Sequence, residues 1–333
     1  MKAVGYYQSL PHENPESLVD VQVPAPTPGP NDLVVRVKAI SVNPVDTKQR
    51  MRAQSKDGTP VILGYDVSGV VEQVGSAVTQ WKTGDEVFYA GDISRPGGNS
   101  ELHAVDARIV GHKPKSLSHA ESAALPLTAL TAYEALHERL QVKEGQTLLI
   151  LGGAGGVGSM TIQMAKLAGL TVIATASRPE SAEWVKKIGA THVVDHTKPL
   201  APQLEALGIK TVDAIFNTAN TEEYWEQMAE IIKPFGRIAS IVEAHKPLDL
   251  TLLMMKSVTF GWELMFTRSL FQTPDMSEQS RILTQVAEWI DRGDLVTTAS
   301  NVLTPITAKN LRKAHGLLES RKAVGKVVLE GWN

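Results

Sequence analysis

Short apolar runs alternate with longer segments of helical spacing through the middle of the chain, and this pattern predicts strands and helices in turn. The clearest pair is the apolar run 147–151, expected of a parallel strand buried on both faces, and the helical segment 159–169. Further strands are predicted at 171–175, 192–195, 214–217, 238–242 and 257–261, with helices at 180–188 and 225–232 among them. Such alternation predicts an α/β fold with a doubly wound parallel sheet.

The first third of the chain has a different pattern, with short strands separated by turn residues. Strands are predicted at 33–40, 67–74, 86–90 and 100–105. Their close spacing predicts a compact, barrel-like β domain. Apolar residues have helical spacing from residue 118 onward, and we expect Pro126 to break this helical segment. An amphipathic helix is predicted at 279–292. The last apolar run, 325–329, has no neighbouring strand in sequence, so we expect it to pair with the N-terminal β domain.

A glycine-rich turn joins the first strand of the α/β region to its helix. It contains Gly153, Ala154, Gly155, Gly156, Val157 and Gly158. The first, third and last of these fit the G-x-G-x-x-G spacing, which lets backbone N–H groups approach a pyrophosphate at the N-terminus of a helix. Glycines also serve ordinary turns, but the strand before and the helix after provide the context that dinucleotide binding requires.

The residues after the next predicted strand indicate which nucleotide is bound. NAD binders carry an acidic residue about 20 positions past the glycines. Here the strand is followed by Ser177 and Arg178, a hydroxyl and a guanidinium, which suit a 2′-phosphate. Because the acidic residue is missing, we predict that the cofactor is NADPH. The alternative for Arg178 is that it is a solvated surface residue with no role in binding. His196 follows the next strand and either flanks the same phosphate or is a bystander.

Composition narrows the class of protein. The 333 residues are 43% hydrophobic and 21% charged, with a net charge of −3 and no cysteine. A mildly acidic chain is not expected to bind nucleic acid or an anionic membrane, and no apolar run is long enough to span a bilayer. The start of the chain resembles a strand rather than a signal peptide. The lack of cysteine excludes disulfides and cysteine-ligated metals and fits a cytoplasmic location.

The chain resembles, from end to end, the medium-chain dehydrogenase/reductase superfamily and its quinone oxidoreductase branch, including zinc-type alcohol dehydrogenase-like proteins. The matching segments follow in the family's order at 43–46, 63–69, 84–87, 124–133, the glycine turn and 325–329. The resemblance implies a GroES-like substrate domain (1–124 and 267–333), a Rossmann domain (125–266), and an active site in the cleft between them.

The resemblance also shows a departure from zinc alcohol dehydrogenases. Those enzymes carry cysteine where Asn43 stands, histidine and glutamate where Tyr65 and Asp66 stand, and another cysteine near Leu127. Their proton-relay hydroxyl falls at Val45. Zinc catalysis needs about three good ligands and an open position. We therefore expect no zinc at this place.

Without zinc, the easier reaction is hydride delivery to an acceptor that is already electrophilic, such as a quinone or an α,β-unsaturated carbonyl. We predict an NADPH-dependent, zinc-independent oxidoreductase that acts on a small-molecule acceptor. Tyr65 and Asn43 would polarise the acceptor oxygen, with Tyr65 a candidate proton source, although Tyr65 could instead only fill the volume of a metal. Asp46 would orient Tyr65 or Lys48, or serve as a helix N-cap.

Other candidate site residues follow from the resemblance. Thr131 would contact the nicotinamide or pack at a helix start, and Ser240 and Ile241 would border the nicotinamide. Candidate pocket walls are Phe88, Trp262 and Phe266, which could equally be core residues. Residues 257–265 resemble the last Rossmann strand, which in the family commonly pairs with its twin, so a homodimer is implied.

The sequence is also compatible with two alternatives. One is a zinc-dependent alcohol dehydrogenase with unconventional ligands, and the other is a non-catalytic NADPH-binding protein. The sequence does not identify the physiological acceptor, because pocket shape depends on loops such as 92–98.

Overall fold

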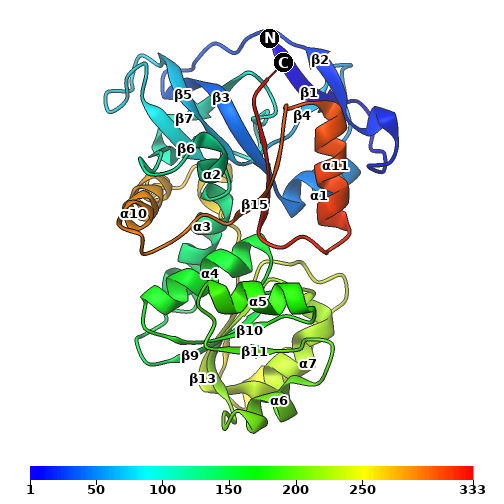
Figure 1. Ribbon diagram of the computed structural model, residues 1–333, viewed down its shortest axis with the longest axis vertical. Coiled ribbons are helices and arrows are strands. Elements are labelled where there is room, and N and C mark those ends of the chain that lie inside the picture. Colours follow the sequence, from blue (N-terminus) through cyan, green and yellow to red (C-terminus); the bar gives the residue numbers. More distant parts are fainter. Residues whose placement is uncertain (333) are drawn as a thin grey trace. The chain divides into compact units, whose positions relative to one another are not determined.

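The computed structural model describes residues 1–332 and divides the chain into two compact units. Unit 1 comprises Met1–Leu127 and Phe266–Asn333, and unit 2 comprises Thr128–Met265. Figure 1 shows the N-terminal segments in blue and the C-terminal segments in orange and red within the same unit. The boundaries expected from the sequence, at residues 124 and 267, lie within three residues of these.

Unit 1 is built mainly of strands. Its strands are β1 (Lys2–Tyr6), β2 (Val19–Gln22), β3 (Asp32–Val42), β4 (Val61–Ile62), β5 (Val67–Val74), β6 (Glu86–Tyr89), β7 (Leu102–Asp106), β8 (Gly111–His112), β15 (Ala299–Leu303) and β16 (Lys326–Glu330). Its helices are α1 (Pro44–Arg52), α2 (His119–Ala123), α9 (Thr267–Leu270), α10 (Glu278–Arg292) and α11 (Ala308–Glu319), with 3₁₀ turns at Pro15–Ser17 and Ala107–Ile109.

The strands of unit 1 form two sheets. One has the order β15-β16-β3-β5-β6-β8, with β7 also paired to β3, and the other has the order β2-β1-β4. The last strand, β16, runs antiparallel to β3 and places Val327 opposite Val42. This confirms that the C-terminal strand returns to the N-terminal β domain.

Unit 2 contains a parallel sheet covered by helices. Its strands are β9 (Thr147–Leu151), β10 (Thr171–Thr175), β11 (His192–Val194), β12 (Val212–Asn217), β13 (Ile232–Ser240) and β14 (Thr259–Trp262). Its helices are α4 (Gly156–Leu167), α5 (Pro179–Lys187), α6 (Leu200–Ala206), α7 (Thr221–Ile231) and α8 (Thr251–Met254), while α3 (Pro126–Glu134) begins in unit 1 and continues into unit 2.

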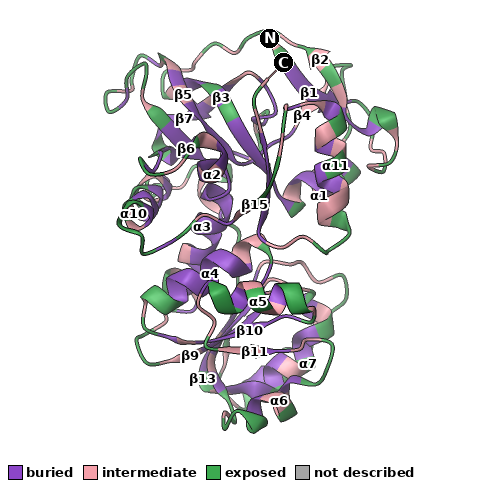
Figure 2. Ribbon diagram, in the orientation of Figure 1, coloured by how far each residue is buried: buried purple, intermediate pink, exposed green. Residues whose placement is uncertain are grey.

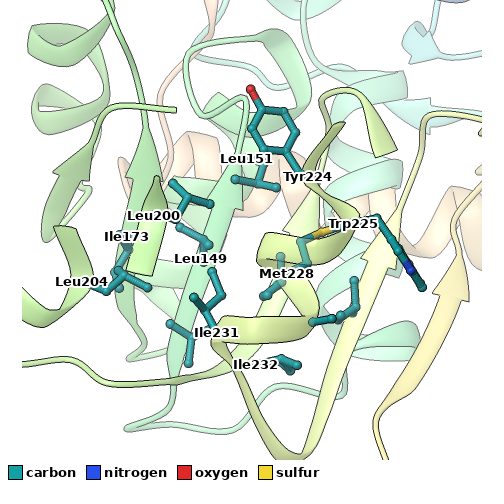
Figure 3. Packing of buried hydrophobic residues seen from close by; sticks show 14 of the residues in the cluster. Leu149, Leu151, Ile173, Leu200, Leu204, Tyr224, Trp225, Met228, Ile231 and Ile232 are labelled. Carbon is teal, nitrogen blue, oxygen red and sulfur yellow. The ribbon is translucent and has the colours of Figure 1, made fainter. Parts of the chain in front are cut away.

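The strand order β11-β10-β9-β12-β13-β14, with every pair parallel, confirms the doubly wound sheet. From β9 the strands are added in one direction to β11, and from β12 in the other direction to β14, so the strand order reverses between β9 and β12. Ligands of such sheets bind at this point, outside the carboxyl ends of the strands. Under one face, side chains of α6, α7 and α8 pack on the strands around Leu149, Met228 and Ile232 (Figure 3). The strands are mostly buried, whereas α5 carries exposed residues along one side (Figure 2).

One local prediction was wrong. We expected Pro126 to break a helix, but it is the first residue of α3, which continues into a π-helical turn at Ala135–Arg139. Proline is tolerated in the first turn of a helix because the N–H groups there have no partner within the helix. The break falls before it, since α2 ends at Ala123.

Among residues 1–332, no helix combines the length and apolar character that crossing a membrane would require.

Candidate functional site

The glycine turn of unit 2 connects β9 to α4 at the point where strand order reverses. Gly155 is the N-cap of α4, with φ −71° and ψ 172°, and has no side chain to cap the helix. The N–H of Gly152 donates to Thr175 Oγ1 at 2.9 Å, and the N–H of Gly153 to the Thr175 carbonyl at 3.2 Å. These bonds fix the start of the turn, while the first N–H groups of α4 remain to be satisfied by a ligand or water.

The glycines of the turn differ in how much space a side chain would have. A Cβ at Gly158 would lie 2.3 Å from the Gly152 carbonyl oxygen, so helix and turn approach too closely for any side chain. A Cβ at Gly153 would lie 2.8 Å from that of Ala174 in β10. At Gly155 the only neighbour is Gly152 O, at 3.5 Å, which is ordinary contact. The fold therefore requires Gly153 and Gly158, whereas Gly155 leaves open space in front of the helix. Ala154, Gly156 and Val157 complete the turn, as expected from the sequence.

The candidate 2′-phosphate residues lie along one edge of the sheet. Thr175 of β10 is in register with Val194 of β11, so Ser177, Arg178 and His196 all follow the carboxyl ends of neighbouring strands. Ser177 is exposed, and Arg178 is partly exposed at the N-cap position of α5. Nδ1 of His196 is buried and has no hydrogen-bond partner among the described residues. The structure thus places these three residues at the same edge as the glycine turn.

Of the residues predicted to border the nicotinamide, Ser240 and Thr131 are buried and Ile241 is partly exposed. Ser240 ends β13 opposite Asn217 of β12, and its Oγ lies 3.1 Å from Asn217 Nδ2 and 2.7 Å from Thr221 Oγ1. The N–H of Ile241 donates to the Asn217 carbonyl at 3.2 Å. Thr131 lies in α3 and is 4% exposed. The hydroxyl of Ser240 is committed to a polar network, so main-chain groups remain its means of contacting a cofactor.

In unit 1, the candidate catalytic residues gather where β3 ends and α1 begins. Asn43 is the N-cap of α1, and its N–H donates to Asp46 Oδ2 at 2.7 Å, which forms one half of a capping box. The other Asp46 oxygen accepts from the N–H of Gly64 at 3.0 Å. Asp46 is the third residue of the helix, so the suggestion that it serves as N-cap was wrong. Burial raises the pKa of Asp46 to about 7.

Asp66 organises this region of unit 1. Its Oδ1 accepts from the Leu127 N–H at 2.7 Å. Its Oδ2 accepts from Ser41 Oγ at 2.8 Å, Asn43 Nδ2 at 2.7 Å and Lys326 Nζ at 3.1 Å. Asp66 is fully buried and Lys326 is 3% exposed. We call Ser41, Asn43, Asp66, Leu127 and Lys326 the Asp66 cluster. It brings together positions 43, 66 and 127, which the resemblance associates with the metal of zinc relatives.

Tyr65 adjoins this cluster through its backbone, because its carbonyl accepts from Asn43 Nδ2 at 3.3 Å. The ring is 4% exposed and packs edge-on against Phe266, with centroids 5.6 Å apart. Within residues 1–332 its hydroxyl has no hydrogen-bond partner, so the donor remains available. Burial, and then the nearby charge of Asp46, raise the pKa of the Tyr65 phenol, which keeps it protonated.

The three candidate pocket walls lie in different surroundings. Phe266 contacts Tyr65, as a wall residue would. Phe88 is fully buried in β6, where a core role accounts for it. Trp262 is 47% exposed in β14 and packs edge-on against Phe260 in unit 2. A wall role for these aromatics stays a prediction.

The donor set of the Asp66 cluster does not fit zinc. Zinc prefers thiolate and imidazole ligands, and the cluster offers a hydroxyl, an amide, one carboxylate, an aliphatic side chain and an ammonium. The carboxylate is already paired with an ammonium, and among the described residues no group of three or more histidine, cysteine, aspartate or glutamate side chains could hold a metal ion. The structure therefore supplies oxygen acceptors for Lys326 rather than ligands for zinc.

Sequence reasoning did not predict the contacts that Asp66 and Lys326 make. Lys326 begins the last strand, where a charged residue would ordinarily face solvent, and its partners lie more than 200 positions away. Its place beside a glycine and before an apolar run was visible, but no local pattern indicates what its side chain contacts.

Comparisons with known proteins agree with this architecture. Residues 29–127 match the alcohol dehydrogenase GroES-like domain family, and residues 156–283 match the zinc-binding dehydrogenase family. A zinc-type alcohol dehydrogenase-like protein of Staphylococcus aureus is 41% identical over 335 residues, which cover 99% of each chain. A quinone oxidoreductase of Pseudomonas aeruginosa is 31% identical over 91% of this chain and 92% of its own length. A 2-methylene-furan-3-one reductase of Solanum lycopersicum is 37% identical over 65% of this chain and 56% of its own length.

Solved structures are similar over the whole chain. A candidate zinc-dependent alcohol dehydrogenase of Rhizobium etli is 50% identical with a TM-score of 0.96, covering 100% of this chain and 98% of that one. The Escherichia coli quinone oxidoreductase, solved with NADPH, is 25% identical with a TM-score of 0.86, covering 99% and 100%. On this evidence the chain belongs to the medium-chain dehydrogenase/reductase superfamily and is an oxidoreductase of that type, similar to its zinc-type alcohol dehydrogenase-like proteins.

Proposed function

We propose that this protein is an NADPH-dependent reductase that delivers hydride to a quinone or an α,β-unsaturated carbonyl without zinc. The observation that carries the proposal is the chemistry around Tyr65: its buried phenol adjoins the Asp66 cluster, which holds a carboxylate paired with an ammonium instead of a metal-ligand set. Such surroundings suit an acceptor that is already electrophilic, because oxygen gains charge as hydride arrives and needs only a hydrogen-bond donor.

Unit 2 supports NADPH as the hydride donor. The glycine turn and the start of α4 would hold the pyrophosphate, and Ser177 and Arg178 would bind the 2′-phosphate with a hydroxyl and a guanidinium. The sequence has no acidic residue at the end of β10 to take the ribose hydroxyls of NAD. The quinone oxidoreductase solved with NADPH supports the same choice.

The bound nicotinamide would supply one hydride, which carries both electrons of the reduction. The chain's own part is to orient the acceptor, with the Tyr65 hydroxyl donating a hydrogen bond to its oxygen as negative charge develops. Asn43 is the less available donor, because both hydrogens of its amide already point to Asp66 and to the Tyr65 carbonyl. A proton from Tyr65 or from water completes the reduction. The names of the tomato reductase and the Pseudomonas quinone oxidoreductase support this acceptor class.

We also propose a homodimer formed through the outer edge of β14. This strand is at the edge of the sheet of unit 2; its Trp262 is 47% exposed, and Leu264, two residues after the strand, is 51% exposed. Nearby in sequence, Met254 and Met255 are 67% and 88% exposed. An edge strand flanked by exposed apolar side chains favours pairing with a second copy. Sedimentation of wild type and Trp262→Asp should give a dimer and a monomer; a monomeric wild type would contradict the proposal.

The function is tested by an acceptor screen with NADPH and NADH in parallel. We expect turnover of simple quinones or enones, faster with NADPH at equal concentration. Metal analysis accompanies it, on protein purified without a histidine tag. Stoichiometric zinc that turnover requires would favour an alcohol dehydrogenase instead. Tight NADPH binding with no turnover on a broad panel would favour a non-catalytic role.

A further inference from the structure

Lys326 is buried with all of its hydrogen-bonding capacity used. It is the first residue of β16, and its side chain is 4% exposed. Its ammonium contacts the Val42 carbonyl at 3.0 Å, Asn43 Oδ1 at 2.5 Å and Asp66 Oδ2 at 3.1 Å. An ammonium has three N–H donors, so these three oxygens satisfy it completely. It therefore has no hydrogen left for an acceptor molecule and can act only through its partners.

The ammonium determines how the Asn43 amide is oriented. Because Oδ1 faces Lys326, Nδ2 must face the other way, where it donates to Asp66 Oδ2 at 2.7 Å and to the Tyr65 carbonyl at 3.3 Å. The reverse orientation would place an NH₂ group against the ammonium, which has no acceptor. The cation thus fixes the group that holds the backbone of Tyr65.

The same cation balances the buried charge of Asp66. That carboxylate also accepts from the N–H of Leu127, the second residue of α3, at 2.7 Å, and so ties the start of this helix to the residue before β5. A buried carboxylate without a partner is strongly destabilising, whereas deletion of both charges together costs much less. Loss of Lys326 alone should therefore disturb the segment that carries Tyr65.

We propose that Lys326 is a positioning residue of the reductase site and that its ammonium serves as the structural cation at the place where zinc relatives carry their metal. This rests on the proposed function. Lys326 holds Asn43 and Asp66 in one arrangement, and they hold Tyr65 in turn. A divalent cation at this place would be repelled by the fixed positive charge of Lys326. The chain therefore lacks the zinc ligands and carries an ammonium in the position of the metal.

The test compares Lys326→Met, which keeps the length of the side chain and removes its charge, with Lys38→Met as the matched control. Lys38 is exposed in β3 and also lies on a strand of unit 1. We expect kcat for reduction of the acceptor to fall about 10²-fold in Lys326→Met, because a displacement of Tyr65 by about 1 Å has an effect of this size. The Kd for NADPH should be unchanged. Lys38→Met should match wild type in both.

A double variant separates positioning from stability. Lys326→Met with Asp66→Asn removes both charges, so its urea midpoint should recover most of what Lys326→Met loses, while kcat stays low because the Asn43 amide is no longer fixed. Hydrogen exchange of residues 61–70 should increase in Lys326→Met and not in Lys38→Met, whether or not an acceptor is present. Recovery of kcat together with stability would overturn the positioning role.

The outcomes also distinguish this inference from the proposed function. A wild type that reduces no quinone or enone with NADPH overturns the proposed function, and the role of Lys326 in it as well. An active wild type with an equally active Lys326→Met overturns only the inference. Increased exchange in Lys326→Met with reduced kcat supports both.

Discussion

Two glycines of the turn, three positions apart, should respond oppositely to the same added methyl group. At Gly155 a Cβ meets only Gly152 O, at 3.5 Å, and the backbone φ of −71° and ψ of 172° suit alanine. Substitution there should leave stability in the absence of cofactor within about 1 kcal/mol of wild type, since a compatible Gly→Ala change gains only about 0.4–1 kcal/mol from the unfolded chain. At Gly158 the added atom would lie 2.3 Å from Gly152 O and 2.8 Å from Gly153 Cα. Both neighbours are backbone, so overpacking should destabilise Gly158→Ala by about 1–3 kcal/mol.

For NADPH affinity we expect the sensitive position to be Gly155, whose substitution should leave stability nearly unchanged. The open space at Gly155 lies in front of the α4 N-terminus, where the pyrophosphate is expected. A methyl group in this space would hold the pyrophosphate away from the backbone N–H groups of the helix. A loss of about 1.4–3 kcal/mol corresponds to roughly 10- to 150-fold weaker NADPH binding.

The assay pairs urea unfolding of both variants without cofactor with NADPH titration by fluorescence. The expected pattern is a Gly155→Ala protein of wild-type stability that binds NADPH poorly, and a Gly158→Ala protein that unfolds at lower urea. Wild-type affinity in Gly155→Ala would refute the assignment of this turn to the pyrophosphate. A large loss of stability in Gly155→Ala would refute the steric reasoning itself.

Three further changes test other parts of the protein. Arg178→Ala should weaken NADPH binding about 10- to 100-fold, as expected for loss of a charged hydrogen bond worth about 1.5–3 kcal/mol, and leave NADH binding unchanged; equal losses in parallel titrations would contradict the phosphate role. Tyr65→Phe should lower kcat about 10²-fold with little change in NADPH affinity, and unchanged kcat would assign Tyr65 to packing. His315 is buried, its Nδ1 accepts from Arg50 Nη1 at 2.7 Å, and burial lowers its pKa to about 3. The unfolded state then binds a proton at higher pH than the folded state, so stability should fall as pH drops below about 6.5, by up to about 1.4 kcal/mol per pH unit. In urea unfolding at pH 7 and 5, His315→Gln should show a smaller fall than wild type; an identical fall would contradict the linkage.

The fold was predictable because its signals are local or repeat along the chain. The apolar run before the glycine turn and the helix after it gave the first β-α pair, and the alternation that follows gave the doubly wound sheet. The return of β16 to β3 was predictable by exclusion, since a final strand needs a partner. Pro126 was misjudged because proline ends one helix and begins another equally well, and only the capping geometry distinguishes them.

The candidate site was predictable only in part, and the reason is sequence separation. The positions of Asn43 and Tyr65 followed from the family resemblance, and the structure brings both to the Asp66 cluster. The contact of Lys326 with Asn43 joins residues 283 positions apart, and it depends on the register of β16 against β3. A shift of one residue would turn Lys326 to the other face of the sheet, so no pattern within the strand could identify its partners.

The ligands of a cation also indicate which cation a site is built for. Zinc is bound by soft or borderline donors, sulfur and imidazole nitrogen, with an open position for substrate. The acceptors that converge on Lys326 are all oxygens, from the Val42 carbonyl, the Asn43 amide and the Asp66 carboxylate, and they suit the three hydrogens of an ammonium. An ammonium with all its donors satisfied cannot polarise an acceptor as a Lewis acid does. The polarising group must therefore be another residue, and in unit 1 the buried Tyr65 hydroxyl, held protonated by its surroundings, is the donor adjacent to this cluster. The proposed replacement of the metal by Lys326 would thus favour acceptors that need one hydrogen bond over alcohols, whose proton must be removed before hydride can leave.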